Sequence, residues 1–120
     1  MSDDQVFDEQ AFSLLSDELG IEDTVELLIA FLSDTNGKIE ACVGSVIDRA
    51  SVQREAHAVK SSAATFGFTA LSTIALRLEK GAATMRAAEF SDGMTALRVA
   101  FDDVSRIAHA RFLSRMETAI

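Results

Sequence analysis

The chain has 120 residues and a net charge of −8, and 48% of its residues are apolar. This length fits one domain, and such an apolar content excludes a disordered chain. The acidic charge argues against binding to nucleic acid or to anionic membranes, since both need a basic face. The chain contains no proline, which favours long helices.

The first predicted helix spans Glu9–Leu19, between an Asp8 N-cap and Gly20, which ends it. Residues 1–6 before it are polar, and we expect them to be disordered. A second helix follows from about Glu22. Its apolar residues recur in steps of three and four, as in a buried helical stripe: Val25, Leu28, Ile29, Leu32, Ile39, Val43 and Val46.

Asn36 and Gly37 interrupt the second helix. Either the helix continues at a cost of about 1 kcal/mol or it breaks there. We favour one continuous helix.

Three further helices complete the prediction. The third runs from a Ser51 cap to Phe66 with Gly67 as its stop, the fourth from about Thr69 to Arg86, and the fifth from a Ser91 or Asp92 cap. Their stripes contain Val52, Ala56, Val59, Ala63 and Phe66; Leu71, Ile74, Leu78, Ala82 and Met85; and Met94, Leu97, Phe101, Val104, Ala108 and Phe112. The pattern predicts a single all-α domain over residues 1–120, an antiparallel four-helix bundle with a short extra N-terminal helix.

The single cysteine, Cys42, excludes an internal disulfide and a thiolate metal cluster, and we interpret it as a buried thiol in a reducing compartment. No stretch reaches 18 consecutive apolar residues, and the acidic N-terminus does not look like a signal peptide. We therefore expect a cytoplasmic protein that is complete from Met1.

His57 lies on the outer side of the third helix, about 140° from the centre of its apolar stripe. Lys60, Ser61 and Ala64 share this side and form one patch with it. A free imidazole has a pKa near 6.5, so a ring nitrogen keeps a lone pair at neutral pH that can take up a phosphoryl group. Lys60 could offset the phosphoryl charge, and the small Ser61 and Ala64 would leave the ring accessible.

The alternative for His57 is an ordinary solvated histidine on a helix surface. His109, in the fifth helix, lacks a comparable patch, and we interpret it as structural or solvated.

The segment from His57 to Leu71 resembles the signature of histidine-containing phosphotransfer (HPt) domains, roughly H-x-[LV]-K-[GS]-[SA]-[SA]-x-x-[LIVF]-G-x-x-x-L. The matching residues are His57, Val59, Lys60, Ser61, Ser62, Ala63, Phe66, Gly67 and Leu71. The pair Leu78-Glu79 also falls where the family often has Leu-Glu or Leu-Gln. The length and the helical outline agree over nearly the whole chain.

The resemblance implies a role for each residue of this segment. His57 would be phosphorylated on Nε2, and Lys60 would neutralise the phosphoryl charge. Ser61 departs from the usual glycine, yet it is small and its hydroxyl could bind the phosphoryl group. Glu79 would accept a hydrogen bond from His57 Nδ1–H and leave Nε2 free, unless it is simply a solvated carboxylate. Gly67 would end the helix in the left-handed conformation.

The resemblance also implies partners: receiver domains of response regulators, including that of a hybrid histidine kinase. Such a carrier needs no cofactor or metal of its own, because the receiver would supply Mg²⁺, and we expect a monomer. Since receivers are usually acidic too, the contact would be mainly apolar, with Phe12, Leu15 and Ile21 as candidates.

Other classes of protein fit less well. A kinase dimerisation region usually has an acidic residue after the histidine and a nearby proline, whereas Ala58 follows His57 here. A di-iron bundle needs glutamate three residues before histidine, where this chain has Arg54 and Arg106. No Gly-rich nucleotide loop is present, so the chain should not phosphorylate itself from ATP. The alternative function is that of a helical adaptor that is not phosphorylated and binds a partner protein through an apolar face.

Overall fold

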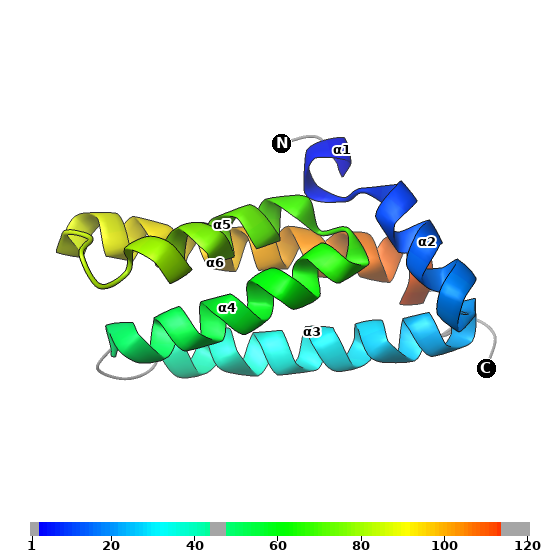
Figure 1. Ribbon diagram of the computed structural model, residues 1–120, viewed down its shortest axis with the longest axis horizontal. Coiled ribbons are helices and arrows are strands. Elements are labelled where there is room, and N and C mark those ends of the chain that lie inside the picture. The colour runs from blue at the N-terminus through cyan, green and yellow to red at the C-terminus, as the bar shows by residue number, and fades with distance from the viewer. Residues whose placement is uncertain (1–2, 44–47, 114–120) are drawn as a thin grey trace.

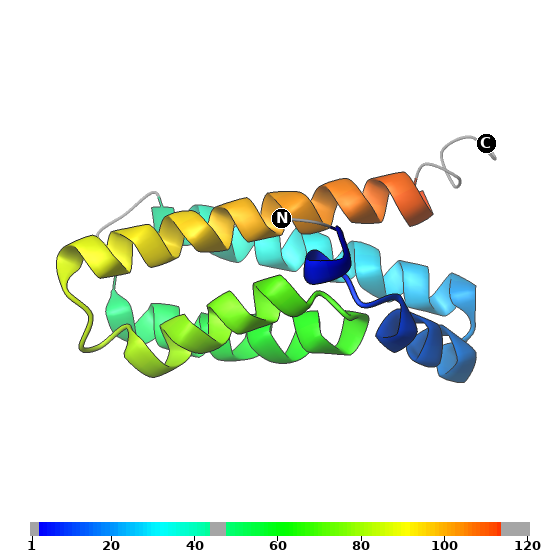
Figure 2. The same cartoon turned by 90° about the horizontal axis from the view of Figure 1, so that it is seen from above.

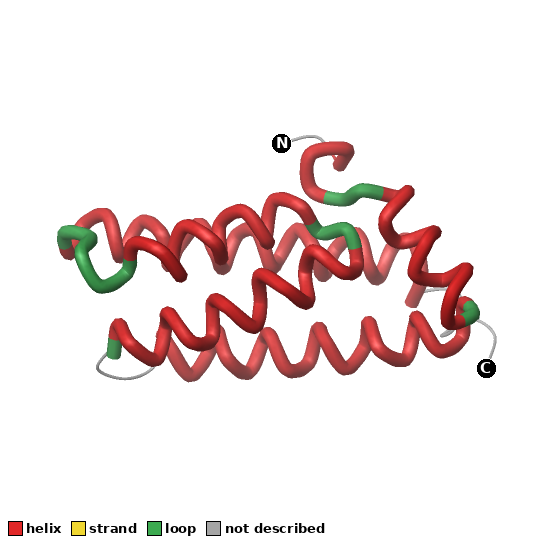
Figure 3. The backbone as a smooth tube through the Cα atoms, viewed as in Figure 1, coloured by secondary structure: helices red, strands yellow, loops and turns green. Residues whose placement is uncertain are grey.

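The structure is a computed structural model that describes residues 3–43 and 48–113. Within these ranges the chain consists of helices joined by short turns and loops and contains no strand, as Figures 1 and 3 show. The elements in chain order are α1 (Asp3–Val6), α2 (Glu9–Leu19), α3 (Ile21–Val43), α4 (Arg49–Phe66), α5 (Thr69–Gly81), α6 (Ala87–Ala108) and the π-helical turn η1 (His109–Leu113). The all-α prediction is confirmed.

Helices α3, α4, α5 and α6 form an antiparallel four-helix bundle, with α4 packed most closely on α5 (Figure 1). Helix α2 lies across one end of the bundle, beside the start of α3 and the end of α4 (Figure 2). The short α1 packs against α5 and α6. This is the predicted bundle with an extra N-terminal helix.

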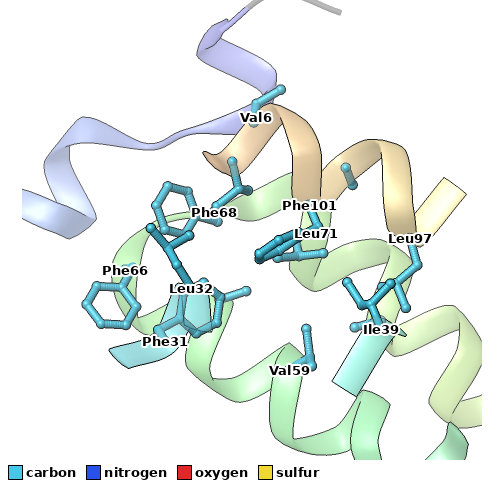
Figure 4. Close-up of a cluster of buried hydrophobic side chains, with 14 of the residues drawn as sticks. Val6, Phe31, Leu32, Ile39, Val59, Phe66, Phe68, Leu71, Leu97 and Phe101 are labelled. Carbon is cyan, nitrogen blue, oxygen red and sulfur yellow. The ribbon is translucent and has the colours of Figure 1, made fainter. Parts of the chain in front are cut away.

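One cluster of buried apolar side chains lies between the helices (Figure 4). Phe31 of α3 packs against Phe66 and Phe68, with ring centroids 5.3 and 5.9 Å apart respectively. All five predicted stripe residues of α4 are buried. Ile29 is the exception in the predicted stripe of α3, because its side chain is 44% exposed. The side chains of Cys42 and Val43, and all of Val46, lie outside the described part of the chain.

The two ends of α2 are as predicted: Asp8 Oδ1 accepts from Gln10 N at 3.0 Å, and Gly20 ends the helix with φ +85°. Helix α3 continues through Gly37 without a break, as favoured. The prediction that residues 1–6 are disordered is wrong for residues 3–6, because α1 forms there and packs Val6 into the core with 1% exposure. Residues 1–2 lie outside the description.

Three helix boundaries differ from the prediction. The N-cap of α4 is Asp48 rather than Ser51, since the Asp48 carboxylate accepts from Ala50 N, and Ser51 Oγ donates to it. Helix α5 ends at Gly81, about one turn early, where Thr84 and Met85 amides bond back to the Gly81 carbonyl. Helix α6 begins at Ala87, ahead of the predicted caps, after an Arg86 whose side chain makes no capping bond.

Candidate functional site

Helix α4 carries His57 on the face opposite its core stripe. Val52, Ala56, Val59 and Ala63 are buried against the bundle, whereas the His57 side chain is 64% exposed. Because the stripe fixes the rotation of the helix about its own axis, it also fixes the outward direction of His57. The predicted orientation of this side chain is confirmed.

Glu79 of α5 faces His57 across the α4–α5 contact. Its Oε1 lies 2.6 Å from His57 Nδ1, the length of a short, charge-assisted hydrogen bond. A carboxylate can only accept here, so Nδ1 carries the hydrogen and donates it, which leaves the Nε2 lone pair free in the neutral ring. The structure thus makes Glu79 a partner of His57 rather than a merely solvated carboxylate.

Lys60 also binds Glu79, because its Nζ lies 2.7 Å from Glu79 Oε2. The two side chains are only 26% and 24% exposed, and Oε2 itself is buried from solvent. The contact with the Lys60 ammonium group, and secondly the hydrogen bond from His57, lowers the pKa of the Glu79 carboxyl below its ordinary value. The ionised carboxylate therefore bridges the imidazole and the ammonium group.

Ser61 and Ala64 are exposed beside His57, as the helical wheel predicts. Neither side chain is larger than a hydroxymethyl group, so neither projects far enough to obstruct the His57 ring. Their positions one and two turns beyond His57 leave an approach to the imidazole from solvent. The four predicted patch residues thus lie on one side of α4.

Gly67 ends α4 in the left-handed conformation, with φ +89°. Its amide bonds to Ala64 O at 3.1 Å, and the Phe68 amide bonds to Ala63 O at 2.8 Å. Its carbonyl accepts from Asp8 N at 2.7 Å, so the N-terminal segment is attached at this point. The predicted helix stop is confirmed, and it also anchors the start of α2.

Two residues near the site were not predicted. Gln53 Nε2 donates to the Glu79 main-chain carbonyl at 3.0 Å, and Ser72 Oγ donates to the Lys60 carbonyl at 3.0 Å. Gln53 lies one turn before His57 on the same face, so its spacing could have marked it. The pairing of Ser72 depends on how α4 and α5 align, which the sequence does not reveal.

The apolar residues proposed for partner contact differ in exposure. Phe12 is only 4% exposed, so that prediction is wrong: its ring stacks on Phe112 with centroids 4.2 Å apart. Leu15 is half-buried against the core, and Ile21 is 54% exposed. Beside α4, a groove of about 260 Å³ runs along α3, with Leu27, Ala30, Ala58 and Ser62 among its lining residues.

The described residues form neither a metal-binding cluster nor a membrane-spanning helix. Across residues 3–43 and 48–113, no group of three or more His, Cys, Asp or Glu side chains is placed to hold a metal ion. None of the helices described has the length and apolar character required to cross a membrane.

Comparison with known proteins supports the resemblance seen in the sequence. Residues 23–107 match the sequence model of the Hpt domain family. Neither the search of curated proteins nor the search of solved structures returned a match. The family match extends over more than two thirds of the chain and includes α4, α5 and nearly all of α6. The chain therefore belongs to the Hpt domain family.

Proposed function

We propose that His57 accepts a phosphoryl group on Nε2 from the aspartyl phosphate of one receiver domain and passes it to another. As an Hpt domain, the protein has a phosphotransfer role in a phosphorelay and interacts with response-regulator receivers. It is a carrier rather than an enzyme with its own ATP site. One observation carries the assignment to His57: an exposed ring whose Nδ1 is held by Glu79 at 2.6 Å.

The transfer is a displacement at phosphorus. The Nε2 lone pair forms the N–P bond as the P–O bond to the donor aspartate breaks, and the carboxylate stays on the receiver. The ring becomes positively charged as it is phosphorylated, and Glu79 stabilises this charge through Nδ1–H. Transfer to the second receiver reverses these steps.

Lys60 supports this chemistry while it is paired with the Glu79 carboxylate. An ammonium group has three donors, so Lys60 can keep its contact to Oε2 and also turn an N–H toward phosphoryl oxygens. Four further points stay predictions. The receiver would supply Mg²⁺, the protein would be cytoplasmic and monomeric, and one of its receivers could belong to a hybrid histidine kinase.

The receivers are proposed to dock over the exposed face of α4. Ser61 and Ala64 keep this face low, and the groove between α3 and α4 offers apolar surface from Leu27, Ala30 and Ala58. The net charge of −8 gives no long-range attraction for an acidic partner. Apolar contact must therefore provide most of the affinity.

Transfer from phosphorylated receivers tests the proposal. With ATP alone the protein should gain no phosphate, and with a phosphorylated receiver it should gain one acid-labile, base-stable group. His57→Gln should abolish this gain and leave the helical circular dichroism unchanged. His109→Gln is the matched control, because His109 is also an exposed histidine, at the far end of α6. Retained labelling in His57→Gln would refute the assignment.

A further inference from the structure

Three side chains of α4 bind a single residue of α5. Gln53, His57 and Lys60 are spaced by four and three residues, so they lie on one face in successive turns. Gln53 Nε2 donates to the main-chain carbonyl of Glu79 at 3.0 Å. His57 Nδ1 donates to Oε1 at 2.6 Å, and Lys60 Nζ contacts Oε2 at 2.7 Å. All three acceptor oxygens of Glu79 are therefore held from the neighbouring helix.

The Glu79 carbonyl needs a donor from outside α5 because Glu79 lies in the last turn of this helix. The last four carbonyls of a helix have no amide one turn further along to bind. After Gly81, the Ala82 amide bonds to Leu78 O, and the Thr84 and Met85 amides bond to Gly81 O. The half-buried Gln53 side chain serves the Glu79 carbonyl instead.

We propose that Gln53 is a positioning residue for His57. By binding the last turn of α5, Gln53 fixes the backbone of Glu79 at the position along α4 where its carboxylate reaches His57 Nδ1. Protein hydrogen bonds keep donor–acceptor distances within about 3.2 Å and weaken steeply at angles below about 120°, so a shift of this helix end loosens the contact to the ring. Gln53 thereby favours the tautomer with a free Nε2. The effect on phosphoryl transfer rests on the function proposed above, whereas the effect on the tautomer does not.

The test compares wild-type protein with Gln53→Met, which keeps the length of the side chain and removes its donor. Nitrogen-15 NMR spectra of the His57 ring report the proportions of the two tautomers. They are recorded at about pH 8.5, two pH units above the ordinary pKa of an imidazole. In the wild type the Nδ1–H form should predominate. In Gln53→Met the ratio of Nε2–H to Nδ1–H should rise about three- to tenfold, the range expected for one lost hydrogen bond.

Transfer kinetics provide the second readout. The rate at saturating phosphorylated receiver should fall by a similar factor in Gln53→Met. The half-saturating receiver concentration should not change, because His57, Ser61 and Ala64 still form the exposed face. If Gln53→Met does not fold, the smaller Gln53→Ala removes the same donor and should give the same shift.

Arg49→Met is the matched control. Arg49 also reaches from α4 to main-chain carbonyls, those of Ala82 and Met85, but these lie beyond the end of α5. This variant should lower stability and leave the tautomer ratio unchanged. An equal shift in Arg49→Met, or a wild-type ratio in Gln53→Met, would overturn the proposal. A shift of the tautomer ratio seen only in Gln53→Met would support the proposal, whether or not a receiver phosphorylates the wild-type chain. If no receiver phosphorylates the wild-type chain, only the proposed function is refuted.

Discussion

Replacing Gly67 with alanine should destabilise the fold by about 1.5–3.5 kcal/mol. A non-glycine residue in the left-handed conformation costs about 1–2 kcal/mol, and φ at Gly67 is +89°. An added Cβ would lie closer than 3.0 Å to the Asp8 carbonyl oxygen, a separation that side chains essentially never show. Relieving this clash moves Asp8 and weakens the Asp8 N to Gly67 O hydrogen bond, at about 0.5–1.5 kcal/mol.

Urea unfolding followed by circular dichroism measures this loss, with Gly37→Ala as the matched control. Gly37 lies within α3, and a Cβ there would have no atom within 4 Å. The control should therefore gain about 0.5–1 kcal/mol, the usual advantage of alanine over glycine in a helix. The reasoning would be refuted if Gly67→Ala were as stable as the wild type, or if both variants changed stability in the same direction.

The other predictions concern the site and its partner surface. The depressed pKa of Glu79 means that its carboxylate stabilises the fold fully above its ordinary value of 4.5 and loses this effect as pH falls through the lower folded value. The stability difference between wild type and Glu79→Gln should therefore narrow below about pH 4.5 in urea unfolding, and a difference that widened on acidification would contradict this. Lys60→Ala should slow transfer by a few-fold to about tenfold, whereas Ser61→Leu should slow it far more by blocking approach to the ring. Transfer by Ser61→Leu at the wild-type rate would show that small size at this position is not needed. Receiver binding measured by calorimetry should weaken little, or strengthen, as salt screens the repulsion between acidic partners, and a tenfold loss at moderate salt would exclude a mainly apolar contact.

The sequence predicted those features that depend on one helix alone. The stripe of α4 placed Ala56 and Val59 inward, and the same periodicity placed His57 outward. Gly67 after the last stripe residue predicted the end of the helix, which is observed there. In each case the information lies within one or two turns of chain, so no knowledge of the other helices is needed.

Among features that depend on contacts between helices, the resemblance supplied the contact of His57 with Glu79, and several others were missed. Phe12 was expected at the surface, but it is buried by Phe112, which is 100 positions further along the chain. The contact of Lys60 with Glu79 depends on the alignment of α4 with α5, and packing across the bundle sets that alignment. The start of α6 was misplaced because the Arg86 side chain makes no capping bond.

The central claim is that Nε2 of His57 carries the phosphoryl group. Nitrogen-15 and phosphorus-31 NMR spectroscopy of the phosphorylated chain tests this claim directly. Labelled protein is phosphorylated by a receiver, and the coupling of phosphorus to each histidine ring nitrogen is recorded. The account predicts coupling to Nε2 of His57, with Nδ1 still bearing the hydrogen that binds Glu79. Coupling to Nδ1 of His57, or to either ring nitrogen of His109, would contradict it.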